Sequence, residues 1–123
     1  SWAYFNLASI YYEEGDFDSS IYNLKKTIEF NPKDMDAYKI YSKIMSKLGH
    51  YDKALSIIEK SIKNCGETGD LYYILAQIFK LKNSKENYVK SMNKALKLNS
   101  TLSISPKLVK KELDTFFKDK QTD

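Results

Sequence analysis

The sequence predicts an all-α protein, an α-solenoid of three helix hairpins followed by a C-terminal helix. Apolar, small and turn positions recur with a period of 34 residues and without a gap, as in the series Tyr4, Tyr38 and Tyr72. Within each repeat the apolar residues have helical spacing. Each repeat is also divided in two by a residue that tolerates a left-handed helix end, in turn Gly15, Gly49 and Asn83.

The composition is that of one folded domain. The chain has 123 residues, of which 42% are hydrophobic and 29% charged, so stacked helices can bury a shared core. No apolar stretch reaches the length of about 20 residues that a membrane-spanning helix needs, so we expect no membrane insertion. Because the sequence starts with Ser-Trp, we expect a fragment of a longer protein, with any targeting or anchoring segment upstream and the compartment unknown.

We expect the first repeat to cover residues 1–34. Its first helix carries a packing stripe at positions i, i+3, i+4 and i+7, namely Tyr4, Leu7, Ala8 and Tyr11. After Gly15, a second helix starts with acidic residues near its positive end and buries Ile21, Leu24, Thr27 and Ile28. Asn31-Pro32 ends that helix, since the residue before proline is disfavoured in the α region.

The second repeat is expected over residues 35–68. Asp34 is a suitable N-cap for a first helix that reaches Leu48 and packs through Tyr38, Tyr41, Ser42 and Met45. The second helix, over residues 52–64, carries Ala54, Leu55, Ile58, Ser61 and Ile62 on its inner face. Cys65-Gly66 then stands where the first repeat has Asn-Pro.

The third repeat, over residues 69–102, has a degenerate turn. Its helices present Tyr72, Leu75, Ala76 and Phe79, then Val89, Met92, Ala95 and Leu96. Asn83 replaces the turn glycine, and Ser84 can cap the next helix. Tyr88 stands where Ala54 allows close approach, and overpacking of that kind costs about 1–3 kcal/mol. We therefore expect the two helices of this repeat to be wedged apart or their turn to be remodelled.

A last helix is expected within residues 103–120. Ser105 is a cap and Pro106 suits the first helical turn. Its apolar stripe comprises Val109, Leu113, Phe116 and Phe117, while Lys107, Lys110, Lys111 and Lys118 point away from it. An amphipathic helix here would cap the packing face that the end of an array otherwise exposes. For the Phe116-Phe117 pair we favour docking on the third repeat over a role as a partner-binding handle.

The order of these positions resembles the tetratricopeptide repeat. The first repeat matches it at Tyr4, Leu7, Ala8, Tyr11, Gly15, Ser20, Leu24, Thr27 and Pro32. The second matches with Gly66 in place of the proline, and the third departs at Asn83, Tyr88 and Ser100. The resemblance implies a right-handed stack of hairpins whose first helices line a concave groove, where partner peptides bind.

The residues opposite the packing stripe on each first helix would then line the groove. In the first repeat they are Trp2, Phe5, Asn6, Ser9, Tyr12 and Glu13. The second repeat contributes Asp36, Lys39, Ile40, Lys43 and Lys47. The third contributes Asp70, Tyr73, Ile74, Gln77 and Lys80. This groove is aromatic at one end and basic in its middle, which suits a partner protein or peptide with apolar anchors and acidic residues.

No catalytic or metal-binding constellation is visible in the sequence. His50 is the sole histidine and Cys65 the sole cysteine, and neither has partners at ligand or catalytic spacing. We therefore expect no enzyme activity, no cofactor and no metal. All basic residues are Lys, and without the bidentate fork of Arg we expect no specific nucleic-acid recognition, although the net charge of +4 allows weak binding to phosphate backbones.

The function that these observations favour is a non-catalytic protein-interaction scaffold that binds a helical or extended segment of a partner in its groove. The alternative is a self-association or intramolecular regulatory module of a larger protein, in which the aromatic N-terminal end docks on another copy or elsewhere in its own chain. Non-specific nucleic-acid binding through lysine ranks third.

Overall fold

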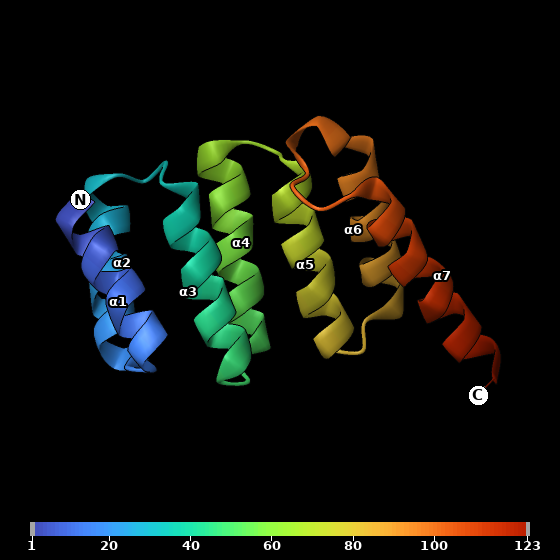
Figure 1. The fold of residues 1–123 in the computed structure, drawn as a ribbon, viewed down its shortest axis with the longest axis horizontal. Helices are drawn as coiled ribbons and strands as arrows, with labels where there is room; N and C mark the ends of the chain where they lie inside the picture. The colour runs from blue at the N-terminus through green and yellow to red at the C-terminus, as the bar shows by residue number, and fades with distance from the viewer. Residues whose placement is uncertain (1, 123) are drawn as a thin grey trace. The chain divides into compact units, whose positions relative to one another are not determined.

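The protein is all-helical throughout the part that the structure, a computed structural model, describes: residues 2–122, with side chains up to Asp119. Figure 1 shows the helices in chain order, and no strand occurs among these residues. The elements are α1 (Trp2–Glu14), α2 (Phe17–Phe30), α3 (Met35–Lys47), α4 (Tyr51–Cys65), α5 (Gly69–Leu81), α6 (Lys85–Lys97), the 3-10 turn η1 (Asn99–Thr101) and α7 (Pro106–Thr122). The predicted all-α class is confirmed.

The chain divides into two compact units at the link between Gly66 and Glu67. The N-terminal unit contains α1 to α4, and the C-terminal unit contains α5 to α7. The finer division into repeats at residues 34, 68 and 102 stays a prediction.

The turns of the three hairpins share one hydrogen-bond pattern. Gly15, Gly49 and Asn83 have positive φ angles of 79°, 82° and 61°. The residue that follows each of them donates its backbone N–H to a carbonyl five residues back, at 2.9 Å (Asp16 to Tyr11), 2.8 Å (His50 to Met45) and 2.9 Å (Ser84 to Phe79). This is the Schellman closure of a helix end. Asparagine makes the turn as glycine does, because its short polar side chain tolerates the left-handed conformation.

Side-chain caps fix three of the helix starts. Asp16, Asp34 and Thr68 accept hydrogen bonds from the backbone N–H groups of Ser19, Ala37 and Leu71 at 3.1–3.2 Å. The cap predicted at Asp34 is thus confirmed, whereas Ser84 precedes α6 without a side-chain bond to the backbone. Its hydroxyl accepts from the Asn87 side chain at 2.9 Å instead.

The core of the N-terminal unit lies between α2, α3 and α4. The predicted stripe of α3 is confirmed, since Tyr38, Tyr41, Ser42 and Met45 are all buried. The Tyr38 hydroxyl donates to the Pro32 carbonyl at 2.8 Å and accepts from the Asn64 amide at 3.0 Å, so this buried polar atom is satisfied.

The predicted stripe of α1 is only partly buried. Ala8 is fully buried and receives the Ser20 hydroxyl on its carbonyl at 2.8 Å, which ties α1 to α2. Leu7, by contrast, is 43% exposed, and the expectation that it packs is wrong. Among the described residues α1 packs mainly on α2, whereas α3 has α2 on one side and α4 on the other.

The C-terminal unit has its own apolar cluster, which includes Ala76, Tyr88, Met92, Val109 and Leu113. The Tyr88 ring lies 4.6 Å from the Phe116 ring between centroids and thus fills space beneath α7. Helices α5 and α6 stay packed on each other, and their turn keeps the hydrogen bonds of the other two. The expectation of a wedged or remodelled hairpin is therefore wrong, because the ring has α7 to pack against.

Helix α7 begins at Pro106 with the Ser105 hydroxyl accepting from the Lys107 N–H at 3.3 Å, as predicted. Val109 and Leu113 are buried and Phe116 is half-buried. Phe117 does not belong to this stripe. It is 46% exposed and meets the edge of Phe116 at 5.8 Å between ring centroids.

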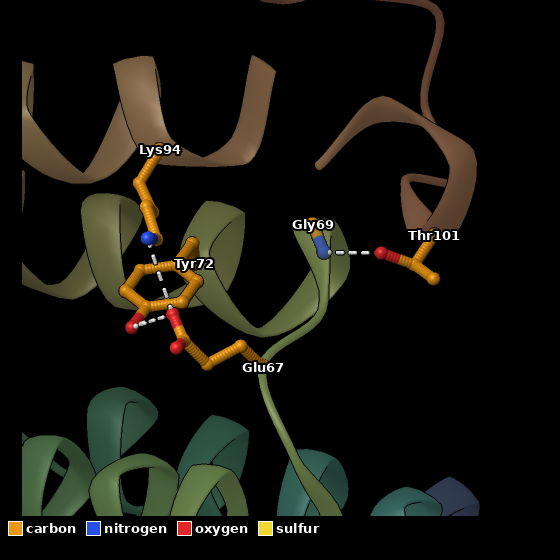
Figure 2. Close-up of polar contacts among 5 residues, drawn as sticks. All are labelled: Glu67, Gly69, Tyr72, Lys94 and Thr101. Atoms are coloured by element: carbon orange, nitrogen blue, oxygen red, sulfur yellow. Dashed lines mark hydrogen bonds and ion pairs between the residues drawn. The ribbon is translucent and has the colours of Figure 1, made fainter. Parts of the chain in front are cut away.

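Polar contacts hold the start of α5 against α6 and η1 (Figure 2). Glu67 accepts from the Tyr72 hydroxyl at 2.9 Å and pairs with the Lys94 ammonium at 3.3 Å, and these two contacts lower the pKa of the Glu67 carboxyl. The Gly69 N–H donates to the Thr101 hydroxyl at 2.8 Å. A Cβ atom on Gly69 would lie 2.5 Å from the Leu98 carbonyl oxygen, so this close approach requires glycine.

Candidate functional site

Eleven of the sixteen predicted groove residues lie in the N-terminal unit, on α1 and α3. Apart from the exposed Glu13 near the end of α1, we name them the α1–α3 face; it consists of Trp2, Phe5, Asn6, Ser9, Tyr12, Asp36, Lys39, Ile40, Lys43 and Lys47. Trp2 is 78% exposed, while Phe5, Ser9, Tyr12, Lys39 and Ile40 are half-buried and the other residues are exposed. The aromatic residues are thus accessible on α1 and the charged ones on α3.

One contact joins the two helices of this face. The Lys43 ammonium lies 5.6 Å from the centroid of the Tyr12 ring, and Tyr12 in turn stacks on Phe17 of α2 at 5.9 Å. A cation near an aromatic face is worth about 0.5–1 kcal/mol at an exposed site. The contact places a lysine of α3 beside Tyr12, near the C-terminal end of α1.

The lysines of α3 recur every four residues. Lys39, Lys43 and Lys47 therefore share one side of the helix, and Lys43 and Lys47 are exposed. Ile40 is half-buried beside them. The Ser9 hydroxyl donates to the Phe5 carbonyl of its own helix at 3.1 Å.

The remaining predicted residues lie on α5 in the C-terminal unit, and three of them hold other parts of that unit. The Asp70 carboxylate accepts from the Ser103 backbone N–H at 2.6 Å and from the Ser103 hydroxyl. Tyr73 and Gln77 both donate to the Glu112 carboxylate of α7, the amide at 3.2 Å. Ile74 is half-buried, and the exposed Lys80 has its ammonium 5.7 Å from the Tyr88 ring.

Glu112 is the residue that sequence reasoning missed. It follows Val109 by three residues and precedes Phe116 by four, so helical spacing alone puts it on the face of α7 that packs. Burial and the Glu112 carboxylate together raise the pKa of Tyr73, which therefore stays protonated and continues to donate. The α5 side chains thus accommodate a carboxylate carried by an amphipathic helix.

The remaining candidates for chemistry do not form a site. His50 precedes α4 without a capping bond, and Cys65 is half-buried with the Ser61 hydroxyl 3.8 Å from its sulfur. Between residues 2 and 122 no group of His, Cys, Asp and Glu side chains is arranged to hold a metal ion. None of the helices in that range is long and apolar enough to cross a membrane.

Comparison with solved structures shows the fold. A MamA crystal structure matches with a TM-score of 0.69 at 21% identity, covering 80% of this chain and 54% of that one. A second MamA structure, MSR-1 C2, gives 0.70 at 20% identity, covering 79% and 56%. YrrB, described as a TPR protein with an unusual peptide-binding site, gives 0.67 at 21%, covering 79% and 50%. The chain thus spans about half the length of these structures.

Sequence comparison identifies the family. No curated protein matches the chain significantly. The family model described as the tetratricopeptide repeat matches residues 3–34 and 69–102, which together make up more than half of the sequence. The matched segments coincide with the hairpins α1–α2 and α5–α6, and the same hydrogen bonds close the α3–α4 hairpin between them. The chain belongs to the tetratricopeptide repeat family.

Proposed function

We propose that this chain is a non-catalytic scaffold that binds a helical or extended segment of a partner protein on the α1–α3 face. Tetratricopeptide repeats serve generally as protein-interaction scaffolds, which supports the broad class. The observation that carries the specific proposal is the contact of Lys43 with Tyr12, which joins the lysines of α3 to the aromatic residues of α1. A partner with apolar anchors and acidic residues complements this surface.

The C-terminal unit supports the chemistry of that ligand. There, α7 is itself an amphipathic helix that packs through Val109 and Leu113 and presents Glu112 to Tyr73 and Gln77. In this unit the repeat helices thus bind an amphipathic helix that carries one acidic residue beside apolar ones. We infer that Asp70, Tyr73, Ile74, Gln77 and Lys80 contribute to partner binding beside these internal contacts.

The test reverses the charge of the face. Peptides are first selected on the wild-type chain from a displayed random library, and their affinities are then measured by fluorescence anisotropy. Lys39→Glu, Lys43→Glu and Lys47→Glu combined should weaken the selected peptides about tenfold or more, and wild-type affinity should fall with added salt. The matched control reverses three exposed lysines of α6, Lys85, Lys90 and Lys97, and should bind as the wild type does.

Stability separates loss of binding from loss of folding. The α6 variant should unfold within about 0.5 kcal/mol per substitution of the wild type, since exposed positions carry little stability. The α3 variant also loses the contact of Lys43 with Tyr12, worth about 0.5–1 kcal/mol, and should still fold. If the selected peptides bind the α3 variant as well as they bind the wild type, the assignment of the binding face is wrong.

Self-association is the second candidate, and exposed apolar residues on the first hairpin favour it. Leu7, Ile10, Tyr22 and Phe30 are between 43% and 62% exposed. A second copy that binds here would cover apolar surface, and exposed apolar residues often mark an interface. Sedimentation equilibrium across a concentration series tests this function, and a monomer throughout would exclude it.

A further inference from the structure

We infer that the N-terminal unit carries a second docking surface, a trough between α2 and α4 that takes an acidic amphipathic helix of a partner protein. This trough is separate from the α1–α3 face and shares no residue with it. One hollow, of about 380 Å³, is lined by side chains of α2, α3 and α4. A second, of about 700 Å³, continues it toward the turn between α3 and α4, and the two share Lys25, Tyr41 and Lys53.

The floor of the trough is apolar. Tyr41 of α3 lies at its bottom, and Ile28 of α2 and Ile57 of α4 line its sides. Tyr41 and Ile57 are 7% and 8% exposed, and Ile28 is half-buried. Hollows of this size with apolar walls are typical of binding sites. Because the two hollows follow one seam between helices, the shape suits an elongated segment rather than a compact small molecule.

The rim of the trough is basic. Lys25 of α2 and Lys53 and Lys60 of α4 line it and are exposed. Each hollow has one acidic residue in its lining. Glu29, in the smaller hollow, already pairs with Lys26 at 3.6 Å, and the exposed Asp52 lines the larger hollow near the turn between α3 and α4. Three lysines around an apolar floor leave positive charge that acidic side chains of a ligand would complement. The positive charge favours an acidic ligand and disfavours a second copy of this chain, because the chain itself has a net charge of +4.

The spacing of the rim residues defines the ligand further. Lys53 and Lys60 are seven residues apart on one helix, and a rise of 1.5 Å per residue separates their Cα atoms by roughly 10 Å along the axis. Acidic residues at i and i+7 of a docked helix have the same spacing. Apolar residues at i+3 and i+4 of that helix would then face Ile28 and Ile57, as in helix-in-groove recognition.

The test uses two synthetic helical peptides of about 15 residues. The acidic probe carries Glu at i and i+7 and Leu at i+3 and i+4, and the basic probe has Lys in place of each Glu. The acidic probe should shift the backbone amide resonances of Ile28, Ser56 and Ile57 in NMR spectra of the full chain, and the basic probe should not. If both probes bind equally, or neither shifts these resonances, the inference is wrong.

Two variants assign the binding to the trough. Lys25→Glu, Lys53→Glu and Lys60→Glu combined should weaken the acidic probe about tenfold or more. The Lys39, Lys43 and Lys47 reversal changes the net charge by the same amount on the other face and should leave the trough resonances responding to the probe. Equal affinity for both triple variants would overturn the inference, because long-range charge alone would then explain the binding.

A steric variant removes the dependence on charge. Ser56 is exposed and lines the trough, so Ser56→Trp should fill it and abolish the response at Ile28 and Ile57 while the circular dichroism spectrum stays unchanged. Undiminished binding to this variant would contradict the inference. Amide shifts at the same residues that grow with protein concentration in the absence of probe would also overturn it, since the occupant would then be a second copy. Peptides selected on the α1–α3 face should still bind Ser56→Trp, so failure of one surface is distinguishable from failure of the other.

Discussion

Helices α1 and α3 have equivalent places in successive hairpins, yet they are buried very differently. Helix α3 buries six residues, whereas α1 buries only Ala8. Tyr38 is 1% exposed and its counterpart Tyr4 is half-buried, and Tyr41 is buried where its counterpart Leu7 is 43% exposed. The difference follows the neighbours among the described residues, because α3 packs on both α2 and α4 whereas α1 packs mainly on α2. In a repeat array the position of a residue decides its burial only together with the helix on each side.

The largest expected change in stability tests this difference between α1 and α3 directly. Tyr38→Ala should lower the free energy of unfolding by about 3–5 kcal/mol, because it leaves a cavity and removes two hydrogen bonds. Tyr4→Ala removes a half-exposed ring stacked on Phe30 at 5.7 Å between centroids and should cost only about 1 kcal/mol. Urea unfolding followed by circular dichroism measures both. Equal losses would show that the neighbouring helix does not decide burial.

The next effect tests how η1 covers the start of α5. Gly69→Ala should destabilise the chain by about 1–3 kcal/mol, since the added methyl group meets the backbone of Leu98 and the side chain of Leu102. Ser100→Ala, at an exposed position of η1, is the control and should stay within about 0.5 kcal/mol of the wild type. The same unfolding assay applies, and a Gly69→Ala variant as stable as the wild type would contradict the close approach.

A smaller change in stability, of opposite sign, is expected at Tyr88, which lies in α6 beneath α7. The Tyr88 hydroxyl is buried and has no hydrogen-bond partner among the residues that the structure describes, while its ring packs on Phe116. Tyr88→Phe should therefore raise the free energy of unfolding by about 1 kcal/mol, because it removes an unsatisfied polar group and keeps the ring. Tyr72→Phe, which breaks the bond to Glu67, should lower stability slightly. Destabilisation by Tyr88→Phe would mean that the hydroxyl has a role in the fold.

The smallest effect is a dependence on pH. The Tyr72 hydroxyl and then Lys94 lower the pKa of Glu67 below its ordinary value of 4.5 in the folded chain. Its contribution to stability is therefore present above that value and is lost as the pH falls through the lowered pKa. Glu67→Gln should lower the melting temperature slightly near pH 7 and change it less near pH 3, so the drop between about pH 7 and pH 3 becomes smaller. An unchanged drop would show that other carboxylates account for the acid sensitivity.

Much of this architecture can be predicted from the sequence because it depends on local residues. The positive-φ residues at Gly15, Gly49 and Asn83, the cap at Asp34 and the stripe of α3 all follow from spacing and backbone preference. Those features need no knowledge of which helices meet.

The errors concern contacts between elements that are far apart in the sequence. Tyr88 is accommodated because α7 returns to cover it, and Glu112 binds Tyr73 and Gln77 from a helix whose docking the periodicity does not fix. The trough between α2 and α4 was missed for the same reason, since its rim lysines belong to two different helices. Only the placement of one helix against another brings such residues together.

The shared closure of the three turns has a consequence for how such a protein can change over time. Each hairpin bends back through main-chain groups, and the one conformational demand is met by glycine in two cases and by asparagine in the third. A turn that is closed by backbone hydrogen bonds does not depend on the identity of the surface residues around it. Mutation can therefore change the exposed side chains of a hairpin, and with them the ligands that it binds, while the arrangement of its two helices stays the same.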